Sequence, residues 1–187
     1  KSNLELDGIY ENYALKVSSM GAQGTGFLPN VLVLNGSTTP EDVSGSISEE
    51  RLESFIARVR YNYDEKYYFE GSFRRDGSTR FAKDVRWGDF FSLAGSWVIS
   101  SEDAFNVKGI DLLKARVSYG EIGNNRGIGY FPYMQLFSTG WNNLTNTGVL
   151  SQGVVDPLLS WEKTASLNAG IDFSLFDDKI SGSIDYY

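Results

Sequence analysis

Three arginines lie close together in the segment RRDGSTR, residues 74–80. A guanidinium group can hold a carboxylate or a phosphate through two parallel hydrogen bonds, so Arg74, Arg75 and Arg80 could recognise an anionic ligand. The alternative is structural: Asp76 and Gly77 form a turn, and the arginines pair with nearby acids. We favour the structural interpretation, because Asp-Gly is a common turn signal.

Two residue types that many catalytic and metal sites require are missing from the chain. It contains no Cys and no His, which excludes disulfides, thiolate or imidazole metal ligands and a Ser-His-Asp triad. Its 24 acidic residues show no motif for the paired carboxylates of a glycoside hydrolase. The glycine-rich GAQGTG, residues 21–26, lacks the spacing of a nucleotide-binding loop. We therefore expect no catalytic, cofactor-binding or metal-binding residues and no enzymatic step.

Aromatic residues gather between residues 122 and 162, among Gly and Asn. Tyr130, Tyr133 and Trp141 could stack on a sugar or contact a partner protein, because long loops of this kind often carry function. Equally, these side chains could pack the loop onto its neighbours. Both interpretations remain open at this point.

The composition indicates the elements that must position these residues. Hydrophobic residues make up 41% of the 187, with 20 Gly, 11 Tyr and 12 Phe but only 4 Pro, which favours strands and turns. The net charge of −7 argues against nucleic acid as a partner.

Apolar and polar residues alternate in most of the chain, with the period of two that is typical of β-strands. In residues 55–63, for example, every second side chain is apolar or aromatic, from Phe55 to Tyr63, and the residues between them include Arg58 and Arg60. Together with a less regular first strand, the pattern predicts about seven strands, at residues 10–19, 55–63, 67–76, 91–99, 113–119, 164–173 and 180–186.

The connections between these strands alternate in length. They cover residues 20–51, 64–66, 77–88, 100–110, 122–162 and 174–179, so every long loop lies at one end of an antiparallel meander. Long loops at one end and tight turns at the other are typical of an outer-membrane barrel. The segment SSEDAF, residues 100–105, could form one helical turn at the short-turn end.

Side-chain placement agrees with a barrel. Tyr63, Tyr67, Trp97 and Phe173 lie on the apolar face near the short-turn end, as in the aromatic girdle at a membrane interface. On the other face, Arg58, Arg60, Arg74 and Arg80 are candidate charges of the lumen or its rim. We therefore predict an all-β, antiparallel up-and-down fold that is a fragment of a large transmembrane β-barrel. The alternatives are a soluble carbohydrate-binding β-sandwich and a secreted carboxylate-based glycoside hydrolase.

Several motifs in series carry a family resemblance. SFRRDGSTRF (72–81), RWGDFFSLAGSWVISSEDAF (86–105), LLKARVSYGEIGNN (112–125) and LSWEKTASLNAGIDFSLFDDKISGSIDYY (159–187) follow one another in that order. Residues 51–187 resemble the C-terminal part of the barrel of SusC/RagA-type TonB-linked (TonB-dependent) outer-membrane transporters. Phe91 departs from the small residue or Pro usual in the WGxFP-like stretch, and the loop at 122–162 departs in detail.

The resemblance implies an origin and a role. Residues 1–187 would be a single segment of a 22-stranded barrel, with the plug and the TonB-contacting N-terminal region outside this sequence. The family imports nutrients, glycans or peptides, through the outer membrane, so outer-membrane lipid and such cargo are expected partners. A SusD-like surface lipoprotein would close the outer mouth, and TonB would act through the plug region. The resemblance identifies neither the cargo nor the role of residues 122–162.

Overall fold

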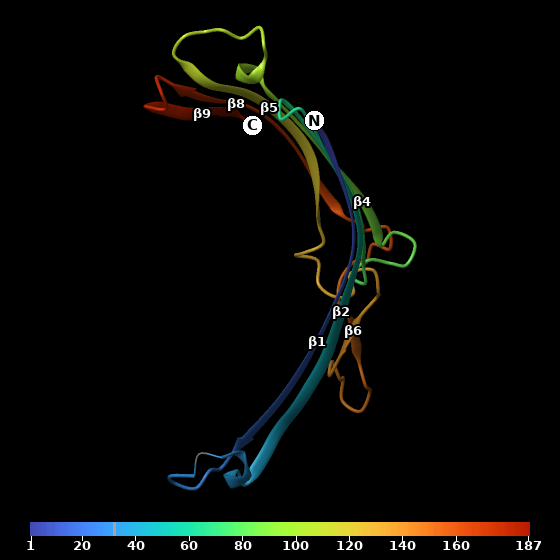
Figure 1. Cartoon of the computed structure of the whole chain (residues 1–187). Coiled ribbons are helices and arrows are strands. Elements are labelled where there is room, and N and C mark those ends of the chain that lie inside the picture. The colour runs from blue at the N-terminus through green and yellow to red at the C-terminus, as the bar shows by residue number, and fades with distance from the viewer. Residues whose placement is uncertain (32) are drawn as a thin grey trace.

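The dominant feature of the protein is one curved antiparallel sheet (Figure 1). The computed structural model describes residues 1–31 and 33–187. Seven strands form the sheet in the order β1-β2-β3-β4-β5-β8-β9, and β6 and β7 pair separately. The bounds are β1 Ser2–Thr25, β2 Thr39–Tyr63, β3 Tyr67–Ser78, β4 Trp87–Val98, β5 Ile110–Asn124, β6 Phe137–Thr139, β7 Val149–Ser151, β8 Glu162–Leu175 and β9 Ile180–Tyr186.

The helices in this part of the chain are two short 3-10 turns, Leu34–Gly36 and Ile99–Ser101, and neither is long and apolar enough to cross a membrane. The second turn confirms the predicted helical turn near SSEDAF, starting one residue earlier than that segment.

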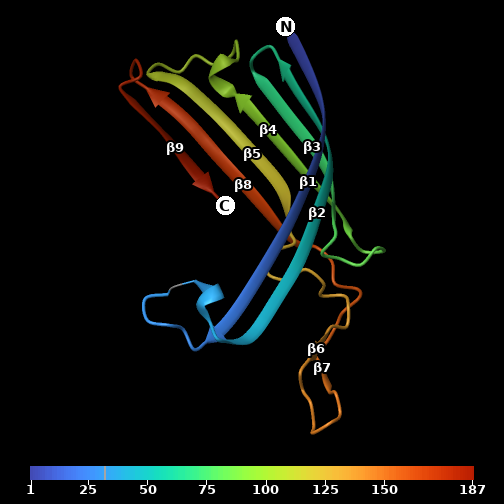
Figure 2. The same cartoon turned by 90° about the horizontal axis from the view of Figure 1, so that it is seen from below.

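The sheet is a single layer, and Figure 2 shows its strands side by side from β1 to β9. Within the described residues, only two apolar side chains are buried, Phe81 and Phe90, at 1% and 3% exposure. A β-sandwich would bury one face of each sheet in a dry core. The all-β meander is therefore confirmed, and the sandwich alternative is wrong.

Pairing across the sheet shows that its two faces differ in chemistry. One row runs Leu4, Tyr61, Phe69, Gly95, Val117, Ala169 and Tyr186, and every member is apolar, aromatic or glycine. The next row runs Glu5, Arg60, Glu70, Ala94, Ser118 and Asn168, and it is mainly polar. Large apolar side chains of the first row stand exposed on the convex face. An apolar row of this kind is typical of a face that lies against lipid, and the lipid-facing assignment stays a prediction.

The tight turns form where they were predicted. Asp64 and Glu65 both have positive φ, 53° and 56°, as a two-residue type I′ hairpin requires. The turn between β8 and β9 places Phe176, Asp177 and Asp178 in the same left-handed region. Both turns lie at the same end of the sheet.

The first hairpin is longer than predicted. Residues 10–19 were expected as the first strand and 20–51 as a loop, but β1 and β2 pair from Ser2–Tyr63 to Thr25–Thr39. The ladder from β2 to β3 ends at Leu52–Ser78, so the first two strands continue beyond it as a ribbon of two strands. In Figure 1 this ribbon curves toward the concave side. Serine and glycine supply much of it, which removes the apolar alternation but still permits backbone pairing.

The predicted Asp76-Gly77 turn is wrong. Both residues belong to β3 and pair with Gly88 and Trp87 of β4. A Cβ atom at position 77 would come within 2.8 Å of the Trp87 ring, so glycine serves here to let the indole lie flat on the strand. The connection itself covers only residues 79–86. The predicted loop at 122–162 likewise begins after Asn124 and contains the small β6–β7 hairpin.

Candidate functional site: inner wall and rim

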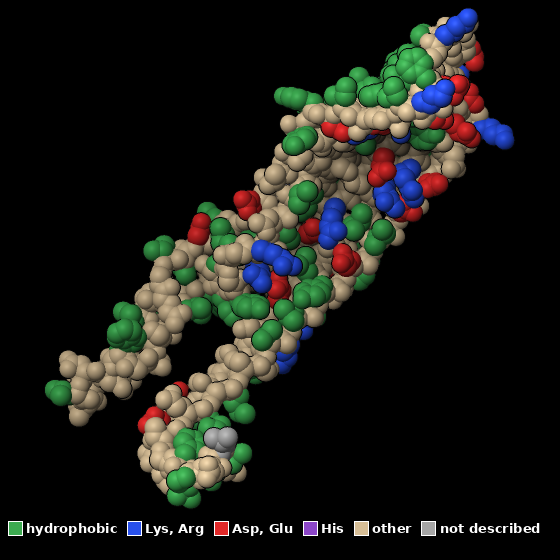
Figure 3. Space-filling model, turned by 90° about the vertical axis from the view of Figure 1, so that its left-hand side faces the viewer, with side chains coloured by type: hydrophobic (Ala, Val, Ile, Leu, Met, Phe, Trp, Pro, Cys, Tyr) green, Lys and Arg blue, Asp and Glu red, His purple; other side chains and the backbone are tan. Residues whose placement is uncertain are grey.

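The concave face of β1 to β5, β8 and β9, here called the inner wall, is covered by ion pairs. Figure 3 looks into this side, where acidic and basic side chains gather in the hollow of the sheet. Arg58 Nε lies 3.0 Å from Asp7 Oδ2, and Arg60 Nη2 lies 2.8 Å from Glu5 Oε2. Each arginine faces its acid in the register of β1 and β2. Both predicted arginines thus lie on the concave face and already hold acids.

A second group of ion pairs spans three strands. Arg116 of β5 lies 3.2 Å from Asp172 of β8 and 2.6 Å from Asp185 of β9. Gly170 lies between them, and a Cβ atom there would approach Asp185 Oδ1 to 2.5 Å. Glycine at this position therefore leaves the space through which the Arg116 side chain extends across β8 to Asp185 of β9.

The middle of the inner wall is hollowed by about 460 Å³. Small residues of β4, Ala94 and Ser96, lie between longer side chains of the neighbouring strands. Lys114 lies over the Tyr68 ring at 5.6 Å, and within the described residues it has no acid within 4 Å. The wall is thus polar and close to neutral, with room beside β4.

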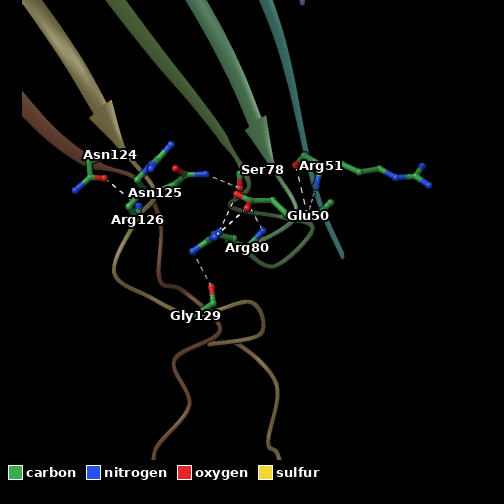
Figure 4. A network of polar contacts seen from close by, with 9 residues as sticks. Glu50, Arg51, Ser78, Arg80, Asn124, Asn125, Arg126 and Gly129 are labelled. Carbon is green, nitrogen blue, oxygen red and sulfur yellow. Dashed lines mark hydrogen bonds and ion pairs between the residues drawn. The ribbon is translucent and has the colours of Figure 1, made fainter. Parts of the chain in front are cut away.

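At the long-loop end, Arg80 joins three segments (Figure 4). Its Nε and Nη2 atoms each donate to one oxygen of Glu50 at 2.8 Å, and Nη1 donates to Gly129 O at 3.4 Å. The guanidinium also lies 4.9 Å from the centre of the Tyr130 ring. Glu50 is only 7% exposed. The hydrogen bonds between Arg80 and Glu50 raise the pKa of Arg80 above the ordinary pKa of an arginine, although burial acts in the opposite direction.

Buried polar groups complete this rim, which comprises Glu50, Arg51, Ser78, Thr79, Arg80, Asn125 and residues 129–130. Ser78 Oγ accepts hydrogen bonds from Asn125 Nδ2 at 3.0 Å and from Arg80 N at 3.2 Å. Arg51 N donates to Thr79 Oγ1 at 2.9 Å, and Thr79 N donates to Arg51 O at 3.1 Å. The rim therefore fixes the start of the long loop against β2 and β3.

Side chains also close a gap between β4 and β5. Their ladder ends at Ser92–Gly120, although both strands continue beyond it. Three donors from the start of β8 and the residues before it bind backbone oxygens at 2.7 to 3.1 Å: Ser160 to Val85, Trp161 to Arg86 and Lys163 to Asp89. The rings of Phe81 and Phe90 pack on Trp161 at 5.3 and 5.5 Å. These contacts tie the start of β8 to β4 and to the loop before it, where the ladder between β4 and β5 is interrupted.

The structure does not bring Tyr130, Tyr133 and Trp141 together into one cluster. Tyr130 packs on Arg80 and lies 6.4 Å from the Phe131 ring. Trp141 is 61% exposed, beside the β6–β7 hairpin, and its Nε1 donates to Ser138 Oγ at 3.0 Å. In the described part of the chain, no hydrogen bond or ring contact links one of the three to another. Tyr130 therefore supports the loop, and Trp141 faces solvent.

The short-turn end carries the aromatic girdle. The Tyr67 ring stacks on Trp97 with centroids 6.3 Å apart, and Tyr63 lies 6.3 Å from Tyr67. Tyr67 Oη and Trp97 Nε1 donate to Glu102 at 2.5 and 2.9 Å, and these bonds hold the pKa of Glu102 below its usual range. Phe173, the fourth predicted member, packs instead against Gly182 of β9.

The chain is similar in sequence and in structure to known proteins. The chain is 39% identical over 161 residues to TonB-dependent receptor P39 of Formosa agariphila, covering 84% of this chain and 15% of the relative. It is 35% identical over 145 residues to TonB-dependent receptor SusC of Bacteroides thetaiotaomicron, covering 73% of this chain and 14% of SusC. A solved structure of the RagAB peptide transporter matches 99% of this chain and 21% of its own, at 25% identity and a TM-score of 0.89. No family model matches the chain.

The strand order and curvature of nearly the whole chain are therefore those of a known barrel. This chain belongs to the SusC/RagA type of TonB-dependent receptors. It spans only about a fifth or less of the relatives it matches.

The arginines predicted as charges of the lumen or its rim are not free in this SusC/RagA segment, and their place in a lumen stays a prediction. Arg58, Arg60, Arg74 and Arg80 each hold at least one carboxylate. Sequence reasoning missed Glu50 and Trp161, which contribute most to the rim and to the gap. Trp161 stands in the quoted motif LSWEK, so its position was visible, but its partner at Arg86 was not. Glu50 offered no such signal.

Proposed function

We propose that the protein containing this segment imports glycans or peptides across the bacterial outer membrane. The observation that carries this proposal is the contrast between the two faces of one sheet. The convex face exposes aromatic and aliphatic rows suited to outer-membrane lipid, and the concave face carries paired charges suited to a water-filled or plugged lumen. Relatives named as receptors and a transporter support import and point away from an enzyme.

The partners follow from the same assignment. A SusD-like lipoprotein would cover the outer mouth, and TonB would supply energy through a plug encoded elsewhere in the parent chain. Loops 26–38, 79–86 and 125–161 would face the outside, and the turns at 64–66, 99–109 and 176–179 the periplasm. RagAB, by its name a peptide transporter, supports peptide as one cargo class. Glycan, which the family resemblance implies, is the other cargo class.

Within this function, the exposed part of the long loop is the candidate contact for cargo or lipoprotein. Residues 137–151 hold Trp141 and the β6–β7 hairpin, away from the Arg80 network. An exposed aromatic ring can stack on a sugar or fill a pocket in a partner protein. Tyr130 and Tyr133 remain candidates for the same role, although Arg80 lies over the Tyr130 ring at 4.9 Å.

The function can be tested by uptake in cells that make the full-length protein. Uptake of labelled glycan or peptide mixtures should depend on the gene and stop when the proton-motive force is collapsed. Deletion of residues 137–151 should leave a folded, membrane-inserted protein with impaired uptake, and Trp141→Ala should reproduce part of the defect. Val154→Ala, at a fully exposed aliphatic position of the same loop, serves as the control. Unchanged uptake after the deletion would show that residues 137–151 have no role in import. Uptake that does not depend on the gene would contradict the proposed import function.

A further inference from the structure

A second hollow of about 460 Å³ lies where the inner wall meets the rim. Tyr13 and Leu15 of β1 and Leu52 of β2 form one side of it, and Arg74, Arg80 and Arg126 reach it from the other elements. The hollow thus combines an aromatic ring, two aliphatic side chains and three guanidinium groups at the entrance to the lumen.

Two of these three cations are already neutralised. Arg74 lies 2.7 Å from Asp76 and 3.3 Å from Glu11, and Arg80 is held by Glu50. Arg126 is exposed, and within the described residues its guanidinium has neither a hydrogen bond nor an acid within 4 Å. Glu11, Glu50 and Asp76 match the three guanidinium groups in number, and among the described residues Arg126 is the arginine of the hollow that a ligand can still pair with.

The backbone that carries Arg126 is fixed in place. Its N–H donates to Asn124 Oδ1 at 2.9 Å, and the preceding residue, Asn125, is buried and donates to Ser78. Figure 4 shows Arg126 next to this network, whereas Arg51 extends from the opposite side of the rim, away from Arg80. A cation on a fixed backbone loses less freedom on binding than one on a mobile loop.

The surrounding acids restrict which anion fits. Glu11 and Glu50 also line the hollow, and Asp76 lies beside Arg74. These carboxylates repel a second negative charge on a ligand, which disfavours a phosphate dianion and leaves a singly charged carboxylate as the better match. The Tyr13 ring and the two leucines can pack on the apolar face of a sugar or on an aliphatic side chain.

We propose that this hollow is a subsite for a carboxylate-bearing unit of the cargo, with Arg126 binding the carboxylate and Tyr13 packing beside it. The inference rests on the proposed import function and names a chemical class within it. A carboxylate of this kind is carried by uronic acid sugars and by the C-terminus of a peptide.

The test measures binding to the purified full-length protein. The probes are the singly charged methyl galactosiduronate and its methyl ester, and acetyl-trialanine and its amide, so that the two members of each pair differ by one negative charge. In at least one pair the acid should bind more tightly than its neutral partner. Arg126→Gln should weaken binding of that acid about tenfold or more, leave the neutral partner unchanged, and so remove the preference. Arg126→Lys should restore part of it, and the pair that responds identifies the source.

Arg51→Gln is the matched control, since it removes a guanidinium from the same rim but not from the hollow. The proposal is overturned if neither acid is preferred, if the preference survives Arg126→Gln, or if Arg51→Gln removes it equally. These outcomes leave the import function standing when uptake of glycans or peptides in cells is still gene-dependent. Failure of uptake itself would contradict the proposed function instead.

Discussion

Arginine–carboxylate pairs occur in two regions of this protein, and the two regions use them differently. On the inner wall, Arg58 and Asp7 are direct cross-strand neighbours, and both side chains remain about one-third exposed. At the rim, Arg80 and Glu50 come from a loop and a strand, and their side chains are only 16% and 9% exposed. The chemistry is the same, but the surroundings are not.

The difference shows what burial adds to an ion pair. An exposed ion pair replaces hydrogen bonds to water with hydrogen bonds between its two side chains, so it contributes little to the free energy of unfolding. The wall pairs therefore mainly keep the concave face polar and neutral. A buried pair leaves an uncompensated charge when one partner is removed. The rim pair therefore holds two loops in position, which the wall pairs do not do.

The largest effect should come from breaking the rim pair. Glu50→Ala leaves the guanidinium of Arg80 buried without its carboxylate, and we expect a loss of about 3–5 kcal/mol in the free energy of unfolding. The loop at 125–161 should also become sensitive to protease, because Gly129 and Tyr130 lose their support. Denaturant unfolding of the full-length protein in detergent and limited proteolysis measure the two effects. A stable variant with a protected loop would show that the rim pair resembles the wall pairs.

The next largest effect is expected from a pair of substitutions that test whether the concave face of the sheet contacts water and the convex face contacts lipid. Val117→Arg places a charge in the hydrocarbon layer and should destabilise the protein by about 2–4 kcal/mol. Ser118→Arg, one residue further along β5, points into the lumen and should be much milder. Folding yields in lipid vesicles compare the two. If Ser118→Arg proved the more harmful, the assignment of the two faces would be reversed.

A wall pair should respond weakly. Asp7→Ala removes the partner of Arg58, but water can solvate the partly exposed guanidinium, so we expect a much smaller loss than for Glu50→Ala. The same unfolding measurement as for Glu50→Ala gives the comparison directly. Equal losses for Asp7→Ala and Glu50→Ala would remove the distinction between wall and rim.

The smallest effect is a pH dependence at the short-turn end, where Glu102 is held by the neutral donors of Tyr67 and Trp97 and lies 3.7 Å from the ammonium group of Lys66. Hydrogen bonds from Tyr67 and then Trp97 lower the pKa of Glu102 from its ordinary value of 4.5. A pKa that is lower in the folded state than in the unfolded state stabilises the folded state at pH values above the ordinary pKa. This contribution is lost as the pH falls through the folded-state pKa. The melting temperature of Glu102→Gln should therefore lie below that of the wild type at pH 7 and approach it near pH 3. A gap of constant size would exclude this linkage.

The wall could be predicted from the sequence because its signal is local. Alternation around Phe55 to Tyr63 assigns each side chain to a face, and the pairing Tyr61–Phe69 and Arg60–Glu70 confirms that assignment. The extent of β1 could not be predicted in this way. Its outer half pairs Ser19 with Ser46 and Gly21 with Ser44, so backbone hydrogen bonds extend the strand where the alternation of apolar and polar residues is weak.

The rim escaped prediction because it depends on distant contacts. Glu50 and Arg80 are thirty residues apart, and no periodicity connects them. Asp76 and Gly77 carry a strong local turn signal, but packing of Trp87 on Gly77 holds them in the strand instead. Arg126 was not singled out for the same reason: only the pairing of every other arginine near the hollow makes it distinctive.

The direct pairing of β5 with β8 has a consequence for how such receptors diverge. Residues 125–161 leave the sheet and return to it without changing the ladder on either side. The chain entropy lost in closing a loop grows slowly with its length, by about 0.6 kcal/mol for each doubling. An insertion that doubled this loop would therefore perturb the fold less than the loss of the single Glu50 carboxylate. Selection can thus lengthen, shorten or exchange the outer surface of the barrel while the wall beneath it stays the same.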